Sequence, residues 1–198
     1  MKRIISTEQK QKKAKRDKLL VGVILVGIMI MSTVGFAIEN NLRTGTDSLG
    51  NKVETVSYNG ITFTKDVGSD WVFPFGASTF VTKNLPQNVS KIDFKTQFSL
   101  ESYRNKPLYT AGDGDAVYEI SRNLQPFASR VQKACLSGEK CNDNSPEKNC
   151  TDDNIIVVKE AGNGPQSVSQ KDNCIYVIAN LNDQYLYADK FIFSLLGI

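Results

Sequence analysis

The stretch that decides the fold class is AVYEISRNLQPFASRVQKAC, residues 116–135. Its apolar residues recur at steps of three and four, which is the period of an amphipathic helix. Asp113 and Asp115 precede it and predict side-chain caps at the helix N-terminus. Pro126 removes a backbone donor inside the pattern, so we expect a kink there or a break into two helices. The sequence thus predicts a long helical segment near the middle of its C-terminal part.

Strand patterns lie on both sides of this helix. Val53–Tyr58 and Ile61–Lys65 flank Asn59-Gly60, a strong signal for a two-residue hairpin turn. Two aromatic runs follow at Trp71–Phe75 and Ser78–Thr82, and Pro74 predicts that the first lies at a sheet edge. Further strands are expected at Lys91–Leu100, Pro107–Thr110, Ile155–Lys159 and Cys174–Ala179, with a short helix or turn at Leu85–Val89, a turn-rich connector at 160–173 and a final helix at Asp183–Leu196.

This order of strands, long helix, strands and helix predicts an α+β fold. We expect a mostly antiparallel sheet covered on one face by two helices. The final helix has its apolar residues on one stripe, and Gly197 is expected to end it.

A membrane anchor is predicted at residues 19–38, LLVGVILVGIMIMSTVGFAI. These twenty residues carry no charge, and at about 1.5 Å of rise per residue they match the roughly 30 Å hydrocarbon core of a bilayer. Two rivals remain open: a signal peptide cleaved after Ala37, although its apolar run would be unusually long, and a pilin-type leader, although no glycine stands at the junction.

The charge of the chain is divided by this segment. Residues 1–18 have eight basic and two acidic side chains, a net charge of +6, whereas residues 39–198 have 16 basic and 19 acidic side chains, a net charge of −3. The positive-inside rule therefore predicts a basic cytoplasmic tail at 1–18, a signal-anchor helix at 19–38, and a C-terminal part outside the cell membrane. Since the outer part is mildly acidic, we expect the bilayer but no nucleic acid among its partners.

Residues 39–51 are polar and rich in Gly, Asn, Ser and Thr, which predicts a flexible tether. Residues 52–198 are long enough to form one extracytoplasmic domain with its own core.

All four cysteines lie in that domain, and an even number in an oxidising compartment predicts two disulfides. Three pairings are possible in principle, and we favour one local bridge in the polar loop and one longer link to the apolar run NCIYVIAN. A zinc site or a redox pair stays as an alternative, although the spacings contain neither tight pairs for zinc nor C-x-x-C. The four residues are Cys135, Cys141, Cys150 and Cys174.

Two N-x-[ST] motifs make Asn88 and Asn149 candidate glycosylation sites. The second motif contains Cys150, which we expect to be bridged, and the bridge would restrict access to it.

The chain contains no histidine, which excludes Ser-His-Asp and Cys-His catalysis and histidine-ligated metals. Nucleotide and hydrolase motifs are also missing from the sequence. The acidic residues around 113–115 and 143–153 suggest calcium or acid/base chemistry, but they lack EF-hand spacing, so a helix cap and a solvated loop are preferred. An aromatic cluster of Trp71, Phe73, Phe75 and Phe80 is interpreted as core rather than as a ligand groove. We predict no cofactor, no metal and no catalytic residue.

The runs NCIYVIAN and DKFIFSLLGI, together with the basic tail, the apolar segment, the YNGITF hairpin and the cysteine-rich loop, resemble a group of membrane-anchored proteins from small-genome archaea. Since that group has no established activity, the resemblance implies location and architecture and transfers no site residue.

These observations predict a non-enzymatic, membrane-anchored extracytoplasmic binding or interaction module with a protein partner in the cell envelope. The alternative is a subunit of a larger membrane assembly, in which Gly22, Gly27 and Ser32 would allow another helix to approach. An enzyme that uses thiols or carboxylates is the third hypothesis.

Overall fold

The computed structural model describes residues 22, 24–26, 29, 44–46, 52–141 and 144–198. Residues 22, 24–26 and 29 are helical. The predicted signal-anchor segment 19–38 and the tail 1–18 otherwise lie outside the described residues, and so does most of the predicted tether. Among the helices that the structure describes, none combines the length and the apolar character that crossing a bilayer requires. The chain divides into two compact units, Met1–Thr44 and Gly45–Ile198. The second unit contains the strands and helices of the following paragraphs, apart from Thr44 of the first strand.

The fold is α+β. Its first sheet has the order β1-β2-β3-β4-β5, and the pairs from β2 to β5 are antiparallel. The bounds of its strands are Thr44–Thr46 (β1), Lys52–Tyr58 (β2), Ile61–Lys65 (β3), Trp71–Phe75 (β4) and Ser78–Thr82 (β5). The hairpin between β2 and β3 is confirmed: Asn59 and Gly60 have φ values of +48° and +80°, as a type I′ turn requires.

Pro74 does not place β4 at the sheet edge, so that prediction is wrong. β4 lies between β3 and β5. Its register with β3 contains only Val72 and Trp71, whereas Pro74 pairs with Thr79 of β5 alone. The proline is exposed and lies beyond the paired part of β3, so its missing N–H removes no hydrogen bond from that ladder.

A second five-stranded sheet has the order β11-β12-β10-β6-β7. The central pairs β12–β10, β10–β6 and β6–β7 are parallel, and only β11 runs antiparallel to its neighbour. We call this sheet the mixed sheet and the first one the antiparallel sheet. The expectation of one mostly antiparallel sheet therefore holds for the first sheet and fails for this one. Its strands are Pro107–Ala111 (β6), Arg130–Lys133 (β7), Asn154–Lys159 (β10), Ser167–Lys171 (β11) and Cys174–Ile178 (β12).

The predicted long helix ends much earlier than its apolar pattern. Helix α3 spans Asp115–Leu124, and the chain then turns and enters β7. Pro126 stops the helix as expected, but the next element is a strand because it pairs in parallel with β6. The predicted aspartate caps are also wrong: the N-cap residue is Gly114, and the side-chain oxygen Oε1 of Gln184 accepts a hydrogen bond of 3.2 Å from the N–H of Ala116.

The other elements are short, apart from one long C-terminal helix. The structure confirms a turn of 3-10 helix at Pro86–Val89 (η1) and the final helix α4 at Gln184–Leu196, which Gly197 ends in a left-handed conformation. The strand expected at 91–100 is absent from the described residues there, and β11 was not expected. The remaining elements are α2 (Leu100–Tyr103), β8 (Cys135–Leu136), β9 (Glu147–Lys148) and η2 (Leu181–Asp183).

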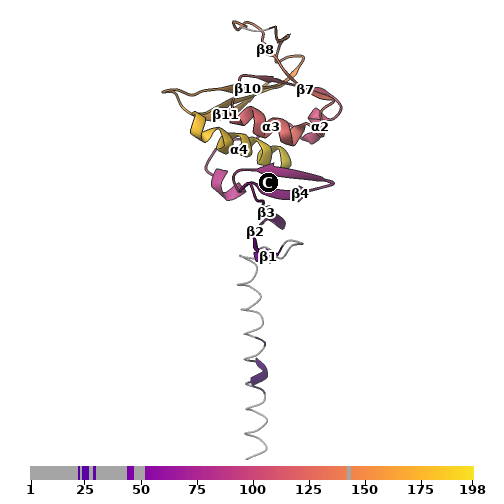
Figure 1. The fold of residues 1–198 in the computed structure, drawn as a ribbon, viewed down its shortest axis with the longest axis vertical. Helices are drawn as coiled ribbons and strands as arrows, with labels where there is room; N and C mark the ends of the chain where they lie inside the picture. Colours follow the sequence, from indigo (N-terminus) through magenta and orange to yellow (C-terminus); the bar gives the residue numbers. More distant parts are fainter. Residues whose placement is uncertain (1–21, 23, 27–28, 30–43, 47–51, 142–143) are drawn as a thin grey trace, which may run out of the picture. The chain divides into compact units, whose positions relative to one another are not determined.

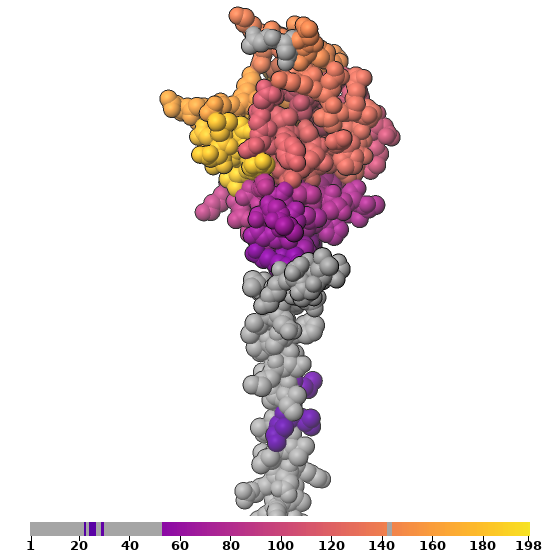
Figure 2. All heavy atoms as spheres, in the orientation of Figure 1, coloured from indigo at the N-terminus to yellow at the C-terminus, as the bar shows by residue number. Residues whose placement is uncertain are grey.

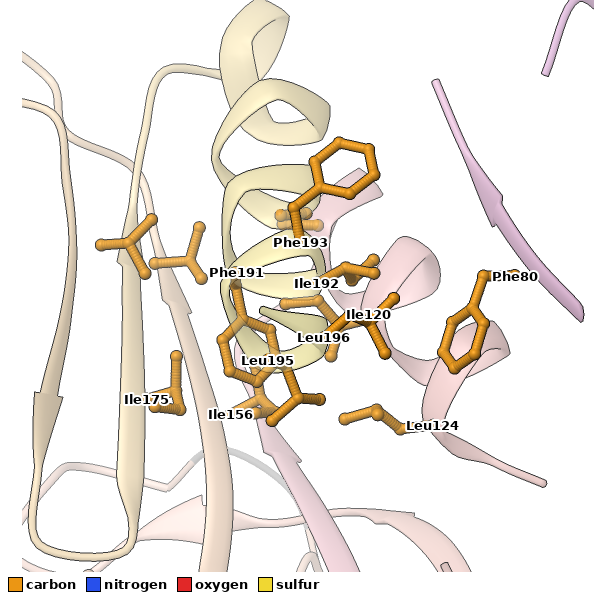
Figure 3. Packing of buried hydrophobic residues seen from close by; sticks show 14 of the residues in the cluster. Phe80, Ile120, Leu124, Ile156, Ile175, Phe191, Ile192, Phe193, Leu195 and Leu196 are labelled. Carbon is orange, nitrogen blue, oxygen red and sulfur yellow. The ribbon is translucent and has the colours of Figure 1, made fainter. Parts of the chain in front are cut away.

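Helices α3 and α4 lie between the two sheets (Figure 1). Because α4 is covered on both sides, its apolar residues are not confined to one stripe. Phe193 lies 6.1 Å from Phe63 of the antiparallel sheet, ring centre to ring centre. Phe191 points the other way, toward Ile156 and Ile175 of the mixed sheet (Figure 3). One continuous core therefore joins both sheets through the helices.

The outer face of the mixed sheet has a smaller core of its own, which includes Tyr109, Ile155 and Val157. Parallel sheets need cover on both faces, and here Leu136 and Cys150 of the cysteine-containing loop pack against this outer core. Figure 2 shows this loop region at one end of the second unit and the antiparallel sheet at the other.

Candidate functional site

A buried polar network joins the helices to the antiparallel sheet, and it contains the strongest candidates for acid/base chemistry. Glu119 of α3 and Asp189 of α4 are both fully buried, and each carboxyl group affects the pKa of the other. Arg122 donates from Nη2 to Glu119 Oε1 over 2.9 Å and from Nη1 to Asp70 Oδ2 over 2.7 Å. Lys83 forms an ion pair with Asp70 from the other side.

The surroundings shift the pKa values of these acids in opposite directions. Burial raises the pKa of Asp189 well above its usual range, and the nearby charge of Glu119 adds to the effect. Burial also raises the pKa of Glu119, against the opposing influence of Arg122. Burial alone would raise the pKa of Asp70, but hydrogen bonds from Lys83 and Arg122 outweigh it and hold that pKa below its ordinary value.

This network does not have the access that an active site needs. A general acid must come within hydrogen-bonding distance of a substrate, whereas Glu119 and Asp189 are 0 % exposed. The surface of the protein has one groove at the β11 side of the mixed sheet, among the described residues, and neither acid lines it. The network instead makes cross-layer contacts: Asp189 Oδ2 accepts from the backbone N and the side-chain Nδ2 of Asn84, over 2.8 and 2.9 Å. These contacts connect the helices to the antiparallel sheet, so we interpret the network as structural.

The accessible candidate is that groove, which has a volume of about 660 Å³. Such a volume falls within the usual range of ligand sites. The lining is mostly polar, with two carboxylates, one ammonium group and two amides. The residues are Asp93, Phe94, Lys95, Gln97, Gln170 and Asp172.

Gln170 of β11 fixes the two walls of this groove to each other. Its Oε1 accepts from Thr96 Oγ1 over 2.8 Å and from the Gln97 backbone N over 3.0 Å. The wall formed by residues 93–97 is also fixed to α4, because Ser194 Oγ donates to the Phe94 carbonyl over 3.0 Å. Contacts that span more than seventy residues of sequence thus hold the segment 94–97 against β11 and α4.

Strand β11 is at the end of its sheet. It pairs with β12 on one side, and on its other side no backbone group of Ser167–Lys171 makes a backbone hydrogen bond with the described residues. An open strand edge beside a polar groove is the arrangement that binds an extended polypeptide by strand addition.

Tyr109, on the outer face of the mixed sheet, is surrounded by cations. Arg130 Nη2 donates to its hydroxyl over 2.8 Å, and Lys148 Nζ lies 4.4 Å from the ring centre. The hydrogen bond from Arg130 lowers the pKa of Tyr109. Because the Tyr109 side chain is buried and Lys148 also pairs with Asp153 at 3.1 Å, we interpret this cluster as a cover for the sheet rather than as an anion site.

The four cysteines form the bridges Cys135–Cys141 and Cys150–Cys174. This is the expected arrangement of one local bridge and one longer link, and no cysteine is left as a free thiol. The second bridge ties the loop to β12 in the outer core. Two disulfides fit an oxidising compartment.

The two candidate glycosylation sites differ in their surroundings. Asn88 is exposed, and its Oδ1 accepts from the Leu85 N–H over 3.0 Å. Asn149 has its Oδ1 bonded to the N–H groups of Thr151 and Asp152, while its Nδ2 donates to Asp152 Oδ2 over 3.0 Å. The amide of Asn149 is therefore engaged in a turn next to the Cys150 bridge.

The structure does not bring the other candidate residues of the sequence together at one site. Asp113 pairs with Lys133 at 3.1 Å, whereas Asp152 bonds within the turn at Asn149, and Asp143 lies outside the described residues. Across the described ranges, no group of acidic and thiol side chains is arranged to hold a metal ion. Three of the four aromatic residues, Trp71, Phe73 and Phe80, are buried in the core, and Phe75 packs against it.

Sequence reasoning missed both the groove and the buried acids. The acids did leave a signal: Glu119 and Asp189 occur next to Ile120 and Ala188, on helix faces that the apolar pattern assigns to the core. The groove left none, because most of its residues are ordinary polar side chains, and they come from the distant segments 93–97 and 170–172. Comparisons of this chain with protein-family models, with curated proteins and with solved structures find no match.

Proposed function

We propose that this protein is a membrane-anchored binding module of the cell envelope, and that it binds an extended segment of a partner protein along β11. The observation that carries the proposal is the groove of about 660 Å³ beside the open edge of that strand. The backbone of the strand offers hydrogen bonds to any extended chain, and the groove offers side-chain selectivity.

The charges of the groove favour one kind of segment. Asp93 and Asp172 contribute two carboxylates against the single ammonium group of Lys95, and none of the three makes an ion pair with the described part of the chain. A segment with a basic side chain near its centre would therefore be preferred.

The anchoring part of the proposal rests on the uncharged segment 19–38 and the basic tail before it, and the two disulfides support a domain outside the cytoplasm. Binding is favoured over thiol chemistry because all four cysteines are bridged, and over acid catalysis because the shifted carboxyl groups are enclosed.

A photo-crosslinking experiment on the full-length chain in intact cells tests this proposal. Benzoylphenylalanine is placed at Gln97, inside the groove, and in a matched control at Lys140, which is exposed in the cysteine-containing loop. We expect adducts with a defined partner protein from Gln97, few from Lys140, and a loss of the Gln97 adducts when Asp93→Lys reverses one groove charge. Equal capture from both positions, or adducts that Asp93→Lys does not reduce, would contradict the proposed site.

A further inference from the structure

Two buried acids, one on α3 and one on α4, each have one carboxyl oxygen that accepts no hydrogen bond. Glu119 Oε2 and Asp189 Oδ1 have no donor among the other described groups, although both are cut off from water. Arg122 Nη2 lies 2.8 Å from Glu119 Oε2 as an ion pair, but its hydrogen bond goes to Oε1. An ionised carboxylate can only accept hydrogen bonds. Since the two buried carboxyl groups also act on each other, a proton shared between them would give both oxygens a hydrogen-bond partner.

The charges around the pair lead to the same conclusion. The groups that face it are Asp70 at the start of β4, Lys83 after β5, Arg122 on α3, and Tyr185 on α4, whose ring lies 5.6 Å from Lys83 Nζ and whose hydroxyl interacts with Asp115. Lys83 and Arg122 supply two positive charges. Asp70 takes one, and a singly protonated Glu119–Asp189 pair takes the other, so these five side chains are formally neutral with the proton and carry a net charge of −1 without it.

We propose that Glu119 and Asp189 share one proton in the folded protein, and that this proton is a pH-dependent latch holding α3, α4 and the antiparallel sheet together. When the proton is lost, two carboxylates repel each other in a site that water does not reach. The same two residues bind Arg122 and Asn84, which connect the helices to the antiparallel sheet. Loss of the proton therefore weakens the joint between the layers.

The direction of the effect follows from linkage. In the unfolded chain both carboxyl groups release their protons in the ordinary acidic range, near pH 4. The folded protein keeps one proton above that range, so unfolding releases a proton and stability falls as the pH rises. For one linked proton, the folding equilibrium constant falls by up to about tenfold per pH unit, until the folded pair also ionises and the dependence levels off.

Asp189→Asn separates this latch from a general effect of pH. The amide places a permanent donor opposite Glu119 Oε2, while its carbonyl still accepts from Asn84, so the network is satisfied without a titrating proton. The matched control is Glu160→Gln, which removes an exposed carboxylate elsewhere in the same unit. Trp71, the single tryptophan, is buried in the antiparallel sheet and reports on it.

The test measures unfolding of the full-length, oxidised chain in detergent by urea and Trp71 fluorescence, from mildly acidic to alkaline pH. We expect the folding constant of the wild-type protein and of Glu160→Gln to fall with pH by several-fold per unit, and that of Asp189→Asn to stay nearly constant. If Asp189→Asn retains the wild-type slope, the proposal is wrong.

A second measurement needs no variant. In wild-type protein carrying ¹³C-labelled Asp and Glu carboxyl groups, NMR titration is expected to show one carboxyl pair that ionises well above the others. Titration of every carboxyl group in the ordinary acidic range would overturn the proposal.

Discussion

Asn123 protects the edge of the antiparallel sheet, and replacing it with alanine should destabilise the protein substantially. β5 is the last strand of that sheet, and no described strand pairs with its outer side. Instead, the buried Asn123 side chain of α3 imitates a neighbouring strand: its Oδ1 accepts from the Val81 N–H over 2.8 Å, and its Nδ2 donates to the Val81 carbonyl over 2.7 Å. The same Nδ2 also donates to the Glu119 carbonyl over 2.9 Å.

The magnitude can be worked out from these contacts. Asn123→Ala removes three hydrogen bonds, each worth about 1 kcal/mol net. Alanine is the better helix former in α3, which returns roughly 0.7 kcal/mol. The free energy of unfolding should therefore fall by about 2 kcal/mol, and the Val81 amide, left without its acceptor, should exchange its hydrogen much faster.

Urea unfolding of the full-length oxidised chain gives the first quantity, and hydrogen exchange at Val81 gives the second. Asn163→Ala is the matched control, because Asn163 is exposed in a turn and its loss should change the free energy of unfolding by less than about 0.5 kcal/mol. If Asn123→Ala behaved like this control and left Val81 protected, the side chain would not be guarding the strand edge.

Two further predictions concern the backbone and the disulfides. Gly112 has φ of +102°, and a Cβ there would lie 2.0 Å from the Val158 carbonyl oxygen, so Gly112→Ala should cost more than about 3 kcal/mol or prevent folding. By contrast, Gly162→Ala, with open space around a φ of +56°, should cost only about 1–2 kcal/mol; equal thermal stability of the two variants would contradict this. Replacing both cysteines of the Cys150–Cys174 bridge by serine should lower the free energy of unfolding by about 3 kcal/mol. The same replacement in the Cys135–Cys141 bridge should lower it by about 2 kcal/mol, since the two bridges close loops of 24 and 6 residues respectively. The reverse order in chemical denaturation would show that loop closure does not govern these bridges.

The local part of the fold could be predicted from the sequence because its signals are short-range. The turn at Asn59-Gly60 needs two positive φ values that few other residue pairs accept. Helix α4 begins and ends within a residue or two of its predicted bounds, since Gly197 provides a left-handed end. The bridge to Cys174 could also be predicted, because Cys174 is the one cysteine that lies in an apolar run.

The error at 116–135 has a different cause. After Pro126 the residues Phe127, Ala128, Val131 and Ala134 continue the helical period by coincidence, since so short a run fits more than one pattern. What decides β7 is its parallel pairing with β6, more than twenty residues earlier in the chain. Such pairing depends on tertiary structure, and local periodicity carries no information about it.

The second sheet could nevertheless have been inferred from α4. A helix covered on one side needs one apolar stripe, but the sequence of α4 also has Phe191, Phe193 and Leu196 outside the stripe assigned to it. Phe193 packs on the antiparallel sheet, and Phe191 packs on the other side of the helix. Too many large apolar residues for one face thus indicate a helix with a sheet on either side.

The same reasoning applies to the buried acids, and it explains why their roles could not be read from the sequence. A carboxylate on the core face of a helix costs several kcal/mol unless it is paired or protonated, so Glu119 and Asp189 each imply a partner somewhere in the fold. Their separation of seventy residues hides the fact that they are each other's partner. Only the packing of α3 against α4 brings the two costs together and allows one proton to offset both. Burial of an acid on a core face is thus predictable from sequence, whereas the group that neutralises it depends on the tertiary fold.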